Sequence, residues 1–208
     1  MTPAEARARA RRGDGDRLRD EILAVTRHLL AETGDEDEVS IRAVCKAVGV
    51  TPPSIYLHFA DKDALIYAVC GDAFAAFDEV LEACDRRTDD PLEALQLRGH
   101  AYVQFGIEHP EEYRILFMNK QARSKEHTPE LATGMIAFTH LVDAVRRAAD
   151  AGAIGPVDPV LAATGIWTAM HGMTSLLISM PAFPWPDIDA LVDHVCATHL
   201  RGLTEGLP

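Results

Sequence analysis

The sequence lacks the short motifs on which most enzyme active sites are built. Its 208 residues contain no G-x-S-x-G, no G-x-G-x-x-G, no P-loop and no E-x-x-H. Acyl transfer, nucleotide binding and di-metal chemistry in helical bundles depend on these patterns. Their absence disfavours an enzyme, and we predict no catalytic residue and no cofactor.

Strand signals are absent as well. No run alternates β-branched and polar residues, and no Asn-Gly turn occurs. Apolar residues recur instead at the spacing of amphipathic helices, with proline and glycine between the runs. The sequence therefore predicts an all-α fold.

Cysteine is scarce and scattered. Cys45, Cys70, Cys84 and Cys196 lie far apart, with no C-x-x-C and no Cys/His ligand spacing. This favours buried thiols in a reducing cytoplasm and predicts no metal site, with a redox sensor as the alternative. The N-terminus has no apolar h-region, so we predict a cytoplasmic protein without a signal peptide.

One stretch, residues 160–180, has no charged residue and is about long enough to span a membrane. It contains six Thr, Ser and His residues, and its nearest flanking charges are Asp158 and Asp187 rather than Lys or Arg. We therefore predict no membrane contact. The stretch is expected to be a helix that protein buries nearly all round.

Positive charge is also in short supply, because 20 Lys and Arg face 32 Asp and Glu, a formal net charge of −12. Residues 1–65 are nearly balanced, with ten basic and twelve acidic residues, and the excess lies in residues 66–208, with ten and twenty. An acidic second part would repel nucleic acid and limit non-specific binding. Solubility is the other explanation.

Residues 40–65 predict two short helices joined by a tight turn and followed by the start of a third. Apolar residues recur at helical spacing over residues 41–48, and Ser40 is a suitable N-cap for that helix. Gly49 ends it, because glycine readily takes the left-handed conformation of a helix stop. Thr51 is placed to cap a second helix, with Pro52 at its first position. This spacing predicts a helix-turn-helix over residues 40–59.

The second of these helices has two opposite faces. Ile55 and Phe59 are four residues apart and are predicted to face the domain core. In a helix-turn-helix the second helix enters the DNA major groove, while the first crosses the backbone. The face predicted to meet DNA comprises Ser54, Tyr56, Leu57 and His58.

The same stretch resembles the DNA-binding domain of TetR-family transcriptional regulators. Spacing and residue types agree without a gap, with two departures. Cys45 stands where the family usually has alanine, and Pro53 stands where a small flexible residue is common. The matching residues are Ile41-Arg42, Val44-Cys45, Gly49-Val50-Thr51-Pro52, Ile55-Tyr56, His58-Phe59, Lys62 and Ala64-Leu65.

The resemblance implies a set of DNA contacts. Residues at the start of the second helix are placed for base edges, thymine methyl groups or nearby phosphates. Tyr56 and His58 match positions that usually touch the backbone, with packing and a helix-end role as their alternatives. Lys62 begins the next helix, where its charge and the free N–H groups favour a phosphate. The implied contact residues are Ser40, Arg42, Thr51, Pro53, Ser54, Tyr56, Leu57, His58 and Lys62.

Residues that start and stop helices divide the chain into three parts. Residues 1–16 are predicted to be a disordered basic arm that either contacts DNA or is a solvated tail. Residues 17–65 form the helix-turn-helix domain, whose first helix covers residues 17–33. Residues 66–208 form a helical ligand-binding and dimerisation domain, which a long helix enters after the N-cap Asp61 and runs to about residue 86. Further helices are predicted to begin at Pro91, Pro110, Pro129 and Pro159 and near Asp187.

This second domain carries a further resemblance. The run HPEEYRILF at residues 109–117 and, later, Trp167 with His171-Gly172 are similar to a TetR subgroup with a C-terminal Trp…His-Gly motif. The resemblance implies homodimerisation through the last two helices. A pocket for a small apolar or amphipathic ligand is predicted from aromatic, Met and His side chains, although any one of them could be ordinary core. These residues are Tyr102, Phe105, Tyr113, Phe117, Met118, Met135, Phe138, Trp167, Met170 and His171.

Together these observations predict a sequence-specific DNA-binding transcriptional regulator. Its expected partners are a palindromic double-stranded operator, a small-molecule ligand and a second copy of the chain. Repression relieved by the ligand is the family's usual outcome. The alternative is a helical small-molecule-binding or adaptor protein whose DNA domain no longer functions.

Overall fold

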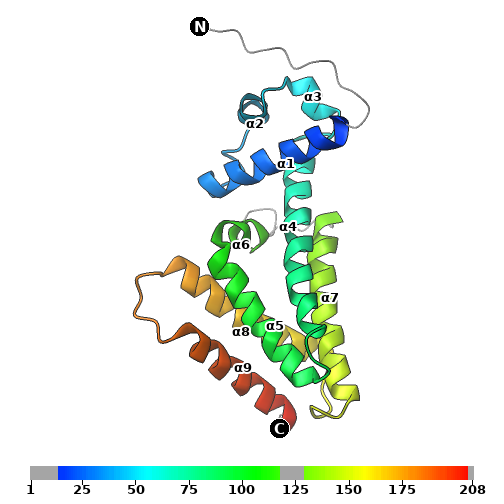
Figure 1. Cartoon of the computed structure of the whole chain (residues 1–208), viewed down its shortest axis with the longest axis vertical. Helices are drawn as coiled ribbons and strands as arrows, with labels where there is room; N and C mark the ends of the chain where they lie inside the picture. The colour runs from blue at the N-terminus through cyan, green and yellow to red at the C-terminus, as the bar shows by residue number, and fades with distance from the viewer. Residues whose placement is uncertain (1–13, 118–128, 206–208) are drawn as a thin grey trace. The chain divides into compact units, whose positions relative to one another are not determined.

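The computed structural model describes residues 14–117 and 129–205, and all regular structure in these ranges is helical (Figure 1). The prediction of an all-α fold is confirmed. The helices are α1 Asp14–Thr33, α2 Ile41–Val48, α3 Pro52–Tyr56, α4 Lys62–Asp85, α5 Pro91–Glu108, α6 Pro110–Phe117, α7 Pro129–Asp150, α8 Pro159–Ser179 and α9 Ile188–Glu205.

The helix starts predicted from proline are confirmed, and the reason is local. The Asp90 carboxylate accepts hydrogen bonds from the backbone N–H groups of Leu92 and Glu93, at 2.9 and 3.4 Å. Asp158 caps α8 in the same way, with 2.8 Å to the N–H of Val160. A proline at the first helical position loses no bond, because that N–H has no partner within a helix.

The first helix begins earlier than predicted. It starts at Asp14 rather than residue 17, so residues 14–16 belong to α1 and not to a disordered arm. The carboxylate of Asp16 in its first turn favours this extension, because the N-terminus of a helix has a partial positive charge. The rest of the predicted arm, residues 1–13, lies outside the described residues.

Two compact units make up the chain, Met1–Val69 and Cys70–Pro208, and the boundary falls within α4. In the first unit, α1 packs on α2, and α2 packs on α3. Its core consists of fully buried aliphatic residues from each of the four helices, to which Phe59 adds an aromatic ring. These residues are Ile22, Leu23, Leu30, Val44, Val48, Ile55, Phe59, Leu65, Ile66 and Val69.

In the second unit, α5 is the central helix and contacts α6, α7, α8 and α9. Its glycines allow close approach. A Cβ on Gly106 would overlap the methyl group of Thr174 on α8 and lie 3.2 Å from the Tyr113 ring. Gly99 has the same function toward Cys196 on α9. The bare backbone of α5 thus sets its spacing from the helices around it.

Helix α8 differs from its prediction. It is long and apolar enough to cross a membrane by length and composition, but only 28% of its most apolar window is buried within the chain. Leu161 is 67% exposed and Leu176 is 48% exposed. Burial nearly all round is therefore wrong for the single chain, because α5, α7 and α9 cover only one side of α8.

We expect Gly106→Ala to destabilise the protein by about 1–3 kcal/mol, because the new methyl group overpacks the α5–α8 contact. The free energy of unfolding in urea measures this effect. Gly15→Ala is the control. Its Cβ would lie 3.9 Å from the nearest side-chain atom, on His58, and its effect should be within about 0.5 kcal/mol. Equal effects of the two variants would contradict the packing argument.

Candidate nucleic-acid interface and ligand site

The capped helix α2 and the left-handed Gly49 position the start of α3, the helix predicted to contact DNA bases. The Ser40 hydroxyl accepts a hydrogen bond from the Ala43 N–H at 3.1 Å, as an N-cap does. Gly49 ends α2 with φ 78°, and its N–H reaches the Cys45 carbonyl oxygen at 2.8 Å. Both predictions are confirmed. The chain then turns over residues 49–51 and enters α3.

The entry of α3 differs in one respect. Thr51 occupies the N-cap position, but its side chain caps no backbone N–H. Pro52 and Pro53 have no N–H to offer, and the Ser54 N–H already reaches the Thr51 carbonyl oxygen at 2.9 Å. The Thr51 hydroxyl lies instead 3.3 Å from the Ser54 hydroxyl. Both hydroxyl groups remain near the surface, at the start of α3.

Ile55 of α3 and Phe59 just beyond its end anchor this segment to the core, and Tyr56 and the C-cap Leu57 project from it. Ile55 is fully buried and Phe59 is 5% exposed. Tyr56 is 52% exposed and Leu57 is 85% exposed. The Arg19 guanidinium lies 5.5 Å from the centroid of the Phe59 ring and adds a cation–π contact from α1. The predicted inward residues are buried, whereas of the four predicted outward residues Tyr56 and Leu57 are exposed and Ser54 and His58 are half-buried. The exposure of Tyr56 does not favour a packing role.

The start of α4 follows directly. The Asp61 carboxylate accepts a hydrogen bond from the Ala64 N–H at 2.7 Å, which confirms it as the cap of this helix. Lys62 is the first helical residue and is half-buried. None of the nine predicted DNA-contact residues is buried. Ser40, Arg42, Thr51, Pro53, Tyr56 and Leu57 are exposed, and Ser54, His58 and Lys62 are half-buried.

In the second unit, three predicted ligand residues form a hydrogen-bonded group. The Tyr113 hydroxyl lies 2.6 Å from His171 Nδ1 and 3.2 Å from the Tyr102 hydroxyl. On the other side of the imidazole, Nε2 lies 3.4 Å from the Ser175 hydroxyl. A neutral His171 with its proton on Nε2 satisfies this chain, because Tyr113 then donates to Nδ1 and Nε2 donates to Ser175.

Burial keeps the whole group neutral. It lowers the pKa of His171 below 6.5, because a charged imidazolium loses hydration there. Burial also raises the pKa of Tyr113, and that of Tyr102 well above 10, with the Tyr113 hydroxyl as a further cause for Tyr102. The group therefore offers neutral donors and acceptors rather than a charge.

Aromatic rings surround this polar group. The Tyr113 ring stacks on His171 at 5.7 Å between centroids, and Phe117 meets His171 edge-on at 5.1 Å. Trp167 lies 6.0 Å from His171 and 5.9 Å from Phe138. The structure thus brings six of the predicted ligand residues into one contiguous set, Tyr102, Tyr113, Phe117, Phe138, Trp167 and His171, which we call the aromatic cluster.

The other four predicted ligand residues are placed differently. Phe105 is buried and packs on Phe77, 4.9 Å away between ring centroids. Met170 is buried beside a cavity of about 10 Å³, which has room for one water molecule at most. Met135 is 55% exposed, near the start of α7, and lies outside the buried core. Met118 lies outside the described residues.

Two residues next to the aromatic cluster were not predicted as site residues. Phe77 meets the Tyr102 ring at 5.1 Å, and Ser175 completes the hydrogen-bond chain. Ser175 could have been found from its spacing, because it lies four residues after His171 on the same helix face. Phe77 could not have been found from the sequence, because nothing in the sequence places α4 against α5.

Comparison with known families now decides the identity. A model described as "Tetracyclin repressor-like, C-terminal domain" matches residues 92–199, and one described as "Bacterial regulatory proteins, tetR family" matches residues 22–69. The chain belongs to the TetR family. It is a TetR-type transcription regulator, with the DNA-binding function that this implies, and the matching families describe regulators rather than enzymes.

Individual TetR relatives agree with this assignment. YobS of Bacillus subtilis, described as an uncharacterized HTH-type transcriptional regulator, is 27% identical over 157 residues, 74% of this chain and 76% of YobS. A Rhodococcus protein of unknown function has a TM-score of 0.80 at 24% identity, covering 98% of this chain and all of that one. A TetR regulator from Marinobacter aquaeolei gives 0.72 at 22% identity, covering 93% and 98%. These two structures support the fold.

The lowered pKa of His171 predicts a pH effect on stability. The unfolded chain binds a proton on this residue more readily than the folded chain does, so the free energy of unfolding falls as pH decreases below about 6.5. We expect His171→Gln to make this fall less steep between about pH 7 and pH 5. Urea denaturation at several pH values measures the slope. His194→Gln, at an exposed site on α9, is the control, and a steeper slope for His171→Gln would contradict the prediction.

Proposed function

We propose that this TetR regulator is a cytoplasmic homodimeric repressor that binds a palindromic operator and is released from it by a small apolar or amphipathic molecule. The observation that carries the proposal is that α3 has one buried face and one exposed face. Ile55 and Phe59 are buried in the first unit, whereas Leu57 and Tyr56 project into solvent. Exposed leucine and tyrosine on a helix this short have no packing role of their own.

The chemistry of the outward face fits a DNA major groove. Leu57 can contact a thymine methyl group, and the hydroxyl groups of Thr51, Ser54 and Tyr56 can reach base edges or phosphates. The face has no Asn or Gln, so paired hydrogen bonds to adenine are not part of this readout. We therefore propose an operator read mainly through apolar contacts and hydroxyl groups.

Phosphate contacts would supply much of the affinity. Lys62 at the start of α4 and Arg42 in the first turn of α2 are the cations of this set. Each lies at a helix N-terminus, where unpaired N–H groups also favour an anion. Because residues 1–65 have no excess of positive charge, affinity would depend strongly on these few positions.

A second copy of the chain is the proposed cover for α8. Its exposed apolar residues include Leu161, Leu176 and Met180, the last 47% exposed. An apolar face of this kind on one helix is typical of an interface. On α9, the other helix predicted to lie at the dimer interface, Leu203 is buried within its own chain and Val195 is partly buried, so neither is proposed as a main contact. In a dimer, two α3 helices would be about 34–36 Å apart.

The effector site is proposed at the aromatic cluster. The rings would enclose an apolar body, while His171, Tyr102 and Tyr113 would bond a polar group. Because these three side chains are neutral, an uncharged or weakly polar effector fits better than a strongly charged one. Its binding would favour a conformation of the dimer in which the reading helices no longer match the operator.

We expect Leu57→Ala to weaken binding to the preferred operator by about 1–3 kcal/mol, the size of one lost base contact. The operator is selected from a random duplex pool with the full chain, and affinity is measured by fluorescence anisotropy. Since Leu57 is 85% exposed, folding should be unaffected. Failure to enrich any sequence would favour an adaptor with a silent DNA domain, and unchanged affinity of Leu57→Ala would exclude the proposed face.

Lys62→Ala should weaken binding to all duplexes alike and lower the slope of log affinity against log salt by about 1, because one phosphate contact is lost. Anisotropy titrations at several salt concentrations measure the slope. Arg146→Ala is the matched control, since Arg146 is an exposed cation of α7 that pairs with Asp143. An unchanged slope for Lys62→Ala would contradict the phosphate contact.

A further inference from the structure

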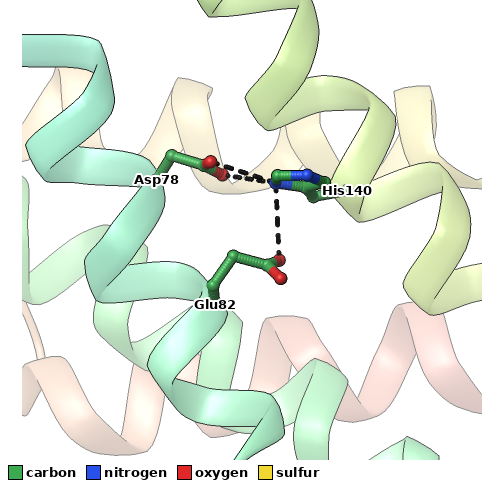
Figure 2. A group of neighbouring side chains, drawn as sticks. All are labelled: Asp78, Glu82 and His140. Atoms are coloured by element: carbon green, nitrogen blue, oxygen red, sulfur yellow. Dashed lines mark hydrogen bonds and ion pairs between the residues drawn. The ribbon is translucent and has the colours of Figure 1, made fainter.

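Three potential metal ligands meet between α4 and α7. Asp78 and Glu82 lie one turn apart on α4, and His140 lies on α7 beside them (Figure 2). One ligand atom from each residue lies within 4.8 Å of the other two. Figure 2 shows the imidazole pointing at both carboxylates.

The spacing of the donor atoms fits one small cation. His140 Nδ1 lies 3.0 Å from each Asp78 carboxylate oxygen and 3.7 Å from Glu82 Oε1. Zinc ligands lie about 2.0–2.2 Å from the metal, and in a tetrahedron two such ligands are about 3.3 Å apart. To hold an ion, Asp78 would therefore move slightly away from His140 and Glu82 slightly toward it.

Charge and donor type favour the same occupant. Two carboxylates at positions i and i+4 repel each other, and a dication between them removes that repulsion. One imidazole and two carboxylates suit Zn²⁺ or a neighbouring transition metal, whereas Ca²⁺ and Mg²⁺ prefer oxygen ligands alone.

The surroundings orient the carboxylates. The buried guanidinium of Arg98 on α5 donates to Glu82 and also to Asp85, the latter at 2.9 Å. Arg147 donates to Asp85 as well, so the two arginines share Asp85 and Asp78 is left facing His140. Bonds of this kind hold a ligand carboxylate in place and are typical of metal sites.

The site is also accessible. The side chains of His140, Asp78 and Glu82 are 36%, 15% and 30% exposed, so an ion can enter from solvent and keep water as a further ligand. The lone pair on His140 Nδ1 must face the ion, which requires the ring proton to be on Nε2.

We propose that Asp78, Glu82 and His140 form a binding site for a divalent transition-metal ion, with Zn²⁺ as the ion that fits best. Occupancy would cross-link α4 to α7 within the second unit. No local ligand spacing predicts this site, because His140 is far from the two acids along the chain.

The test uses the full-length chain, freed of any affinity tag and of metal by dialysis against a chelator. Isothermal titration with ZnCl₂ should give one ion per chain, and Asp78→Asn and His140→Gln should each lower the affinity at least tenfold. Asp193→Asn is the matched control. Asp193 pairs with His100 at 2.8 Å, as Asp78 pairs with His140, but without a second carboxylate beside the pair. Replacing Asp193 should therefore leave the Zn²⁺ affinity unchanged.

A measurement on the unmodified chain guards against misfolded variants. X-ray absorption at the zinc edge should show nitrogen and oxygen neighbours at about 2.0–2.1 Å and none of the sulfur at about 2.3 Å that cysteine ligands would give. Absence of stoichiometric Zn²⁺, sulfur in the first shell, or equal affinity in Asp78→Asn would overturn the proposal and leave an ion pair only. None of these measurements includes DNA, so they are independent of the operator experiments.

Discussion

The burial of Ile55 and Phe59 is the constraint on which the DNA-binding unit depends. These two side chains, four residues apart, fix the orientation of α3 and the residues that follow it, and the Arg19 guanidinium lies over the Phe59 ring. A rotation that exposed either one would cost a large part of the transfer free energy of its side chain, about 1.5–3 kcal/mol. The exposure of Tyr56 and Leu57 follows from this anchoring. The unit therefore offers a chemically defined surface before it meets any partner.

The second unit depends on the closeness of α5 to its neighbours. Gly99 and Gly106 let α9 and α8 approach, and this brings Tyr102 within hydrogen-bond range of a histidine on another helix. Polar atoms inside such a core need hydrogen-bond partners, and here the polar atoms of this group bond to one another. The same arrangement that stabilises the unit thus places these donors and acceptors together, where the effector site is proposed.

Local chemistry could be predicted from the sequence, and long-range contacts could not. The Asp-Pro starts of α5 and α8 and the glycine stops of α1 and α2 depend on a few adjacent residues, so they were recognisable. The exposure of Leu161 could not be predicted, because a helix with few charges has the same sequence pattern whether its own chain or a second chain covers it. Met135 was misplaced for a similar reason, since apolar spacing does not show where a core ends. The candidate metal ligands on α4 and α7 depend on pairing of helices, which periodicity does not encode.

The paired prolines at the start of α3 have a consequence for recognition. Neither has a backbone donor, and both have a fixed φ, so this end of the helix loses little conformational entropy on association. A stiff reading element gives up adaptability in return, because it cannot adjust its backbone to a groove of different width. Operator variants that alter groove shape should therefore be discriminated against even where the contacted bases are the same.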